Sequence, residues 1–193
     1  MSELVLDIET QKLFNETVRD KIHQLKVSVV GLYDYGRDLF QSFEESDLKA
    51  LELILSNTTR LIGFNIRRFD LPVLQPYLFL SVDRLPVLDI LDEVMKVLGH
   101  RVSLQSIAQA TLGRGKSGSG VDAVRLYQEG KIEALKAYCL DDVRLTKEIY
   151  EYGQKHGKVL FFSERASKTF EVPVGWAPSP GGVTPTTFPK SLF

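Results

Sequence analysis

The chain has 193 residues, of which 44% are hydrophobic and 25% charged, a balance typical of a globular protein with enough apolar mass for one medium domain. Its 24 lysines and arginines nearly balance its 25 aspartates and glutamates, and a net charge of −1 argues against a protein that coats long duplex nucleic acid. The single cysteine excludes an intramolecular disulfide and a zinc site built from thiolates.

The N-terminal part of the chain predicts three strands. Apolar runs at Leu4–Glu9, Lys26–Tyr33 and Asp38–Phe43 are separated by polar segments. Residues 34–37 are typical of a turn, so the second and third strands are expected to form a hairpin.

The middle of the chain predicts strands interleaved with helices. Ser46 is expected to cap a helix, followed by a strand at Arg60–Phe64, a short helix at Asp70–Leu78 and a strand at Pro86–Ile90. Helical periodicity then continues over four segments: Leu91–Leu98, Ser103–Leu112, Val121–Glu129 and Ile132–Gln154. This order predicts an α/β protein with a mixed sheet of about five strands and helices on both faces.

The C-terminal part of the chain differs in composition. Val159–Phe162 and Phe170–Val174 predict a hairpin, which Trp176 is expected to anchor. Five of the eight prolines lie at or after residue 173, and no periodicity follows Trp176. We therefore expect a main domain, a hairpin extension and a Pro/Gly-rich tail, at residues 1–157, 158–176 and 177–193.

Asp7 and Glu9 form the first group of candidate site residues. They are two positions apart on a predicted strand, so both side chains point to one face. Two like charges on a buried strand repel each other and lose hydration, and a divalent cation would relieve both costs. The alternative is a strand end whose carboxylates lie in water or in salt bridges.

Tyr138 and Asp142 form the second group. They belong to a stripe of inward-facing positions on one helix: Leu135, Tyr138, Asp142, Leu145 and Ile149. A carboxylate at an apolar position requires a cation, a metal or several hydrogen-bond donors. The alternative is a core tyrosine beside an aspartate that pairs with an arginine.

The segment Asn65–Asp70 forms the third group. Asp70 follows a predicted strand and starts a helix, so it can cap that helix, serve a site, or do both. Arg67 and Arg68 would place positive charge at the same corner, or would form a solvated loop pair.

Together, these groups suit phosphodiester hydrolysis. Two divalent cations about 3.5–4 Å apart activate a water and stabilise the leaving oxygen, and hard cations prefer carboxylate oxygens. Four carboxylates from three separate elements are a suitable complement for such a pair of ions.

The ordered motifs resemble those of the DEDD family of 3′–5′ exonucleases, which have a ribonuclease H-like fold. The motif D-x-E matches Asp7-Ile8-Glu9, followed by Thr10, and N-x-x-x-[FY]-D matches Asn65–Asp70. The tyrosine form of the third motif, Y-x-x-x-D, matches Tyr138–Asp142, whereas the histidine form would need histidine at Ala137. The resemblance therefore favours the tyrosine subgroup.

The resemblance implies a role for each matching residue. Asp7, Glu9 and Asp142 would bind a first Mg²⁺ or Mn²⁺ ion, and Asp7 would also reach a second. Asp70 would hold that second ion through water, and Tyr138 would orient the attacking water. Substrate-binding residues would include five more: Thr10, Asn65, Arg67, Arg68 and Lys116.

The segment Gly113–Ser117 and the residue Asp89 each allow two interpretations. The segment Gly113–Ser117 lacks the first glycine of a phosphate-binding loop, so it predicts either a backbone contact to nucleic acid through Lys116 or a mobile connector. Asp89 ends a predicted strand and is expected to cap a turn, although it could face the site.

We expect from the sequence a metal-dependent 3′–5′ exonuclease acting on single-stranded DNA or RNA ends and releasing nucleoside 5′-monophosphates. A non-catalytic nucleic-acid- or protein-binding module with the same fold is the alternative, and a structure-specific endonuclease is a third hypothesis. A helicase or a repair or processing complex is the expected kind of partner. The acidic N-terminus lacks a secretory apolar segment, and no apolar run suits a membrane span, so we expect a cytoplasmic protein.

Overall fold

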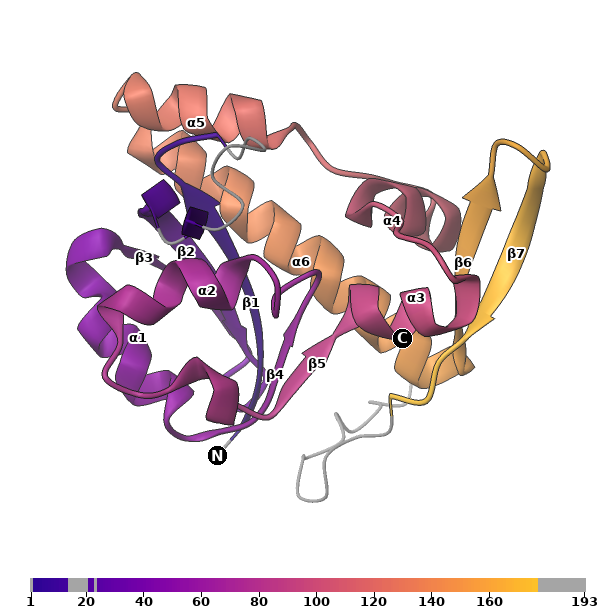
Figure 1. The fold of residues 1–193 in the computed structure, drawn as a ribbon, viewed down its shortest axis with the longest axis horizontal. Helices are drawn as coiled ribbons and strands as arrows, with labels where there is room; N and C mark the ends of the chain where they lie inside the picture. The colour runs from indigo at the N-terminus through magenta and orange to yellow at the C-terminus, as the bar shows by residue number, and fades with distance from the viewer. Residues whose placement is uncertain (1, 14–20, 23, 177–193) are drawn as a thin grey trace, which may run out of the picture.

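A five-stranded mixed sheet forms the centre of the computed structural model, which describes residues 2–13, 21–22 and 24–176 (Figure 1). The predicted tail at residues 177–193 lies outside the described residues. The strand order is β3-β2-β1-β4-β5, where β1 pairs antiparallel with β2 and parallel with β4. The strands are Ser2–Thr10, Val27–Asp34, Leu39–Glu44, Thr58–Gly63 and Val87–Asp89. This arrangement confirms the predicted α/β fold and is consistent with a ribonuclease H-like fold.

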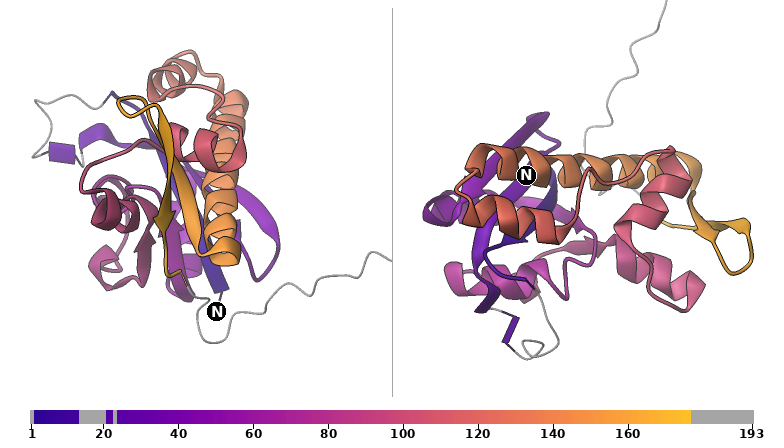
Figure 2. Two further views of the ribbon diagram at one scale, coloured as in Figure 1. Left: turned by 90° about the vertical axis from the view of Figure 1, so that its right-hand side faces the viewer. Right: turned by 90° about the horizontal axis from the view of Figure 1, so that it is seen from above.

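Helices cover both faces of the sheet, as Figure 2 shows in the view from above. They are α1 (Leu48–Leu55), α2 (Asp70–Leu74), α3 (Ile90–Leu98), α4 (Leu104–Leu112), α5 (Gly120–Gln128) and α6 (Ile132–His156). Among the described residues, none of these helices has both the length and the hydropathy required to span a membrane.

The two faces of β1 pack against different apolar clusters, and the candidate site lies on one of these faces. Leu4, Leu6 and Ile8 pack with α1 and α2 in one core, whereas Val5 packs with α3, α4 and α6 in the other. This alternation places Asp7, as expected from the two-residue period, on the face that α6 covers.

Gly31 allows α6 to lie close to the sheet. A Cβ atom at this position would lie 2.8 Å from Val143 Cγ2 and 3.0 Å from Cys139 Sγ, which is too close without a shift of the helix. Gly31 is the register partner of Asp7 on the neighbouring strand, so this close approach occurs beside the candidate site.

The predicted start of the first helix was wrong. Ser46 lies within a 3₁₀ turn, Glu45–Asp47, that leads directly into α1, and no side chain caps α1 at Asp47. The hydroxyl of Ser46 instead lies 3.3 Å from Asp47 Oδ1. The 3₁₀ turn connects β3 directly to α1, so the helix begins without a serine cap.

The predicted C-terminal hairpin is present as β6 (Lys158–Ser163) and β7 (Lys168–Pro173). Its inward-facing residues Val159 and Val172 are fully buried with residues of α4 and α6. Trp176, just after the hairpin, is 3% exposed and stacks on Tyr150 of α6 with ring centroids 5.9 Å apart. The hairpin therefore shares the core of the sheet and its helices.

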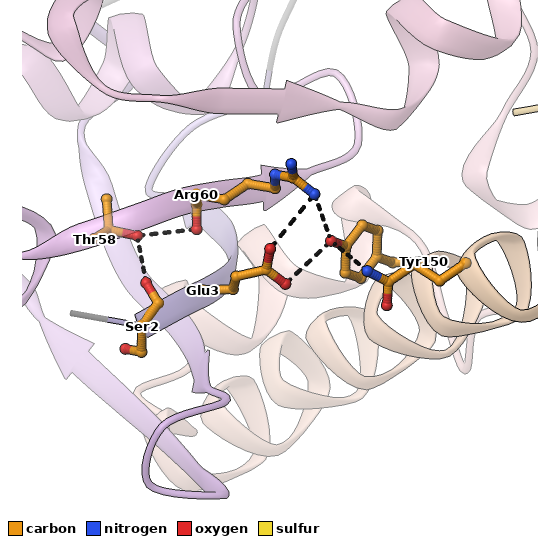
Figure 3. Close-up of polar contacts among 6 residues, drawn as sticks. Ser2, Glu3, Thr58, Arg60 and Tyr150 are labelled. Atoms are coloured by element: carbon orange, nitrogen blue, oxygen red, sulfur yellow. Dashed lines mark hydrogen bonds and ion pairs between the residues drawn. The ribbon is translucent and has the colours of Figure 1, made fainter. Parts of the chain in front are cut away.

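A polar network fixes the C-terminal half of α6 against the sheet (Figure 3). The Tyr150 hydroxyl donates to Glu3 Oε2 over 3.1 Å and accepts from Arg60 Nη1 over 2.9 Å. Gln154 donates to the same hydroxyl over 2.8 Å. Because Glu3 lies on β1 and Arg60 on β4, the network aligns the helix that carries Asp142 with the strand that carries Asp7.

Candidate metal centre

Three carboxylates from two distant segments converge at one end of β1. Asp7 and Glu9 come from β1 and Asp142 from α6, and one oxygen of each lies within 4.8 Å of the others. Asp142 is fully buried and Glu9 is 8% exposed. The structure therefore brings the carboxylates of the first and second predicted groups together.

The surroundings of these carboxylates favour their protonated forms. Burial raises the pKa of Asp7 well above its usual value, and the charges of Asp70, Asp142 and Glu9 raise it further. Burial and the charge of Asp142 raise the pKa of Glu9 to about 8. Burial also raises the pKa of Asp142, although the ammonium of Lys116 opposes this shift. Such a cluster gains free energy from any cation that it binds.

Asp70 reaches the cluster through the backbone of β1. Its Oδ1 accepts a hydrogen bond of 3.0 Å from the amide of Ile8, between Asp7 and Glu9. Asp70 is the first residue of α2 and is 4% exposed. Burial raises its pKa to about 7, against the effect of backbone hydrogen bonds from its own amide and that of Ile8. No side chain caps α2, and this contact holds the Asp70 carboxylate against the backbone between Asp7 and Glu9.

Asp89 holds the turn that precedes Asp70. Its carboxylate accepts hydrogen bonds from the amides of Asn65 (2.8 Å) and Arg67 (3.0 Å), and from Leu91 at the start of α3 (3.0 Å). Asn65 has a left-handed backbone with φ of 65°, which these bonds help to maintain. The predicted capping role is present, and the sequence did not reveal the additional bonds to the Asn65 turn.

Tyr138 lies one helical turn before Asp142, as predicted, and is 8% exposed. Its hydroxyl and Asp142 Oδ1 are buried without a well-formed hydrogen bond to the described residues. Burial and the charge of Asp142 raise the pKa of Tyr138, so its hydroxyl keeps its proton. Unsatisfied buried oxygens beside clustered carboxylates fit a hard divalent cation with bound water.

The ammonium of Lys116 lies at the edge of the cluster, against Asp142, whereas the sequence predicted for Lys116 only a loop position near nucleic acid. Its Nζ is 2.6 Å from Asp142 Oδ2 and 5.8 Å from the ring centroid of Tyr138. Burial lowers the pKa of Lys116, but the charges of Asp7 and Asp142 outweigh this effect and raise it overall. Lys116 therefore stays charged.

A cleft of about 370 Å³ opens beside the carboxylates. Thr10, Asn65 and Lys116 line it, together with Lys12 and Leu13, which the sequence did not single out. Its volume lies within the range of sites for small molecules. A second hollow of about 430 Å³ continues from it past Leu13 and reaches α5.

The two predicted arginines do not line this cleft. Arg67 donates to the carbonyl of Val87 over 2.6 Å, and Arg68 Nε lies 3.9 Å from Asp92 Oδ1. Arg101 contacts a residue that lines the cleft, because its guanidinium donates to Asn65 Oδ1 over 2.8 Å. Sequence patterns gave no signal for Arg101, which precedes α4 in a loop.

The chain matches the model of a known protein family. The family described as the RNase_H superfamily matches residues 4–154, which include every element from β1 to most of α6. No curated protein matches the chain. The matched range contains all three carboxylates of the cluster and the strand order described above.

Proposed function

Since the chain belongs to the RNase H superfamily, whose members often hydrolyse phosphodiester bonds with divalent metals, we propose that it is a metal-dependent 3′–5′ exonuclease. It acts on single-stranded 3′ ends of DNA or RNA and releases nucleoside 5′-monophosphates. The observation that carries this proposal is the convergence of Asp7, Glu9 and Asp142 within 4.8 Å, with Asp70 bonded to the strand between the first two.

Each residue of the site has a role in this proposal. Asp7, Glu9 and Asp142 would hold one Mg²⁺ or Mn²⁺ ion, and Asp7 and Asp70 would hold a second ion, with Asp70 acting through water. Such ions provide Lewis acidity and lower the pKa of bound water. Tyr138, whose buried hydroxyl keeps its proton, would orient the attacking water.

The cleft and the charge of the protein support action on a chain end. The cleft is small and adjoins the carboxylates, which suits a terminal nucleotide better than a continuous duplex. A net charge of −1 disfavours long-range attraction of nucleic acid, so binding rests on short-range contacts and on stacking. Of the proposed substrate contacts, Thr10, Asn65 and Lys116 line this cleft. A helicase or a repair or processing complex is the partner expected to deliver such ends.

The test is digestion of single-stranded DNA and RNA oligonucleotides labelled at either end, with Mn²⁺, Mg²⁺ or EDTA. We expect a ladder that shortens from the 3′ end only when metal is present, and no digestion by the Asp7→Asn variant. A circular single strand should stay intact, and its cleavage would identify an endonuclease instead.

One observation favours a second candidate, a non-catalytic nucleic-acid- or protein-binding module. The ammonium of Lys116 lies 2.6 Å from Asp142, so an internal cation partly balances the cluster without a metal. Absence of cleavage with either metal, together with absence of Mn²⁺ binding in a calorimetric titration, would support this candidate.

A further inference from the structure

The ammonium of Lys116 lies 2.6 Å from Asp142 Oδ2, a carboxylate oxygen of the candidate metal cluster. The side chain of Asp142 is 1% exposed and that of Lys116 is 26% exposed, so the ion pair is largely removed from water. Asp142 faces Asp7 and Glu9, and the ammonium therefore lies at the edge of the three-carboxylate cluster.

The backbone around Lys116 is held in place from two helices. The amide of Lys116 donates to Gln105 Oε1 of α4 over 2.6 Å. A Cβ atom on Gly115 would lie 2.2 Å from Gln105 Nε2, and one on Gly118 would lie 3.2 Å from the ring of Tyr138. These close approaches fix the turn and direct the lysine toward the cluster.

A third contact ties the start of this segment to α6. Arg114 Nη2 lies 2.7 Å from Glu148 Oε2, six residues after Asp142 in the sequence. The segment 113–119 is therefore attached to both α4 and α6. The backbone that carries Lys116 is therefore held beside Asp142 by contacts that do not involve the lysine side chain.

An ammonium and a divalent cation cannot both occupy the same face of Asp142 Oδ2, because like charges repel strongly in a buried site. The ammonium is tethered and carries one charge, whereas the metal carries two and reaches all three carboxylates. We propose that Lys116 is an intramolecular competitor of the divalent metal at Asp142, which the metal displaces on binding. This inference rests on the proposed function.

The displaced ammonium remains in the cleft, because Lys116 lines it beside Thr10 and Asn65. A phosphate group is a strong partner for a free ammonium. A nucleotide phosphate in the cleft therefore forms an ion pair with the Lys116 ammonium that the metal has displaced. Metal and nucleotide strengthen the binding of each other, and by linkage each does so by the same factor.

The first test is calorimetric titration of the full chain with Mn²⁺ alone. The Lys116→Met variant keeps the apolar stem but loses the charge, and we expect it to bind Mn²⁺ about tenfold more tightly than the wild type. The matched control is Lys12→Met, because Lys12 lines the same cleft and makes no ion pair with a described carboxylate. Its Mn²⁺ affinity should change by less than about twofold. Equal changes of Mn²⁺ affinity in both variants would overturn the proposal, since they would reflect only the loss of one positive charge from the cleft.

The second test repeats the titration with deoxyadenosine 5′-monophosphate, a product that cannot be cleaved further. A blank titration of nucleotide without protein corrects for direct Mn²⁺ binding. The nucleotide should increase the Mn²⁺ affinity of the wild type and should increase that of Lys116→Met much less. An equal increase in both proteins would contradict the role of the released lysine.

The outcomes separate this inference from the proposed function. If wild type and Lys116→Met bind Mn²⁺ equally and both digest oligonucleotides, the competition is wrong and the exonuclease proposal stands. If neither protein binds Mn²⁺, the metal centre itself is wrong and both proposals fail. Circular dichroism of each variant checks that the fold is kept.

Discussion

Glu9 and Asp70 are acids that retain protons to unusually high pH. Burial dominates in both, raising the pKa of Glu9 to about 8 and that of Asp70 to about 7. A proton and a metal ion compete for the same oxygens, so the cluster must lose these protons before it binds metal. The pH dependence of metal binding therefore reports directly on the candidate site.

We expect Mn²⁺ affinity to rise with pH between about 6 and 9, because Glu9 and Asp70 lose their protons across this range. The metal-free protein should show the opposite trend in stability, because a carboxyl pKa raised above its unfolded value of 4.5 contributes stability that is lost as pH rises through about 8. Thermal melts across this range, without metal and with saturating Mn²⁺, measure both effects. Glu9→Gln should flatten the slope of the metal-free protein, and an unchanged slope would contradict the assignment.

The residues of the third motif should differ in how much they contribute. Asp142→Asn removes a charged ligand and should reduce digestion by at least about a thousandfold, whereas Tyr138→Phe removes only a hydroxyl that orients water and should reduce it by about 10- to 100-fold. Single-turnover digestion at saturating Mn²⁺ measures both rates. Equal losses would mean that Tyr138 does more than orient water, and a fully active Asp142→Asn would remove Asp142 from the site.

At the level of secondary-structure elements, the site depends on how closely α6 approaches β1 and β2. Gly31 and the small side chain of Cys139 set this distance, and the Cys139 thiol also lies 3.6 Å from the carbonyl oxygen of Asp7. The Tyr150 network fixes the other end of the same helix against β1 and β4. Two separate contacts thus position the helix that supplies Asp142.

Gly31→Ala should test this spacing. Its new Cβ would lie 2.8 Å from Val143 Cγ2, so we expect a loss of about 1–3 kcal/mol in the free energy of unfolding and weaker Mn²⁺ binding. Urea denaturation and calorimetry measure the two effects. In a double-mutant cycle, Val143→Ala provides room for the new methyl group. The double variant should therefore lose less free energy of unfolding than the sum of the losses in the two single variants. Simple additivity would mean that the helix does not pack as described.

At the scale of the whole molecule, the C-terminal hairpin and the face of the sheet that carries the candidate site share one apolar core. Val5 of β1, Ile149 of α6 and Val172 of β7 belong to the same buried cluster. Trp176 completes it, with its ring against Gly153, where a Cβ atom would lie 2.4 Å from Cζ3. We therefore expect the hairpin to unfold together with the sheet.

Trp176→Ala should lower the free energy of unfolding by about 3–5 kcal/mol, whereas Trp176→Phe keeps an aromatic ring and should cost less than about 1.5 kcal/mol. Urea denaturation followed by circular dichroism measures both variants. In the wild type, Trp176 is the only tryptophan, so its fluorescence reports on the hairpin. Coincident fluorescence and circular dichroism transitions are expected for one cooperative unit, and an earlier fluorescence transition would show that the hairpin unfolds separately.

The sequence by itself determined the features that depend on local periodicity. The two-residue period of β1 placed Asp7 and Glu9 on one face, and the helical period of α6 placed Tyr138 and Asp142 on its buried side. The number of strands and the C-terminal hairpin followed from the same patterns. These features are predictable because each depends on neighbours within a few residues.

Only the tertiary structure decided which partners these residues meet. It turned Asp70 toward the amide of Ile8, bonded Asp89 to the Asn65 turn, and placed Lys116 on Asp142. Each of these contacts joins segments more than 20 residues apart, and no local pattern encodes it. The reason is physical: buried polar groups take whichever partner the packing of distant elements brings within reach, and that packing is a property of the whole chain.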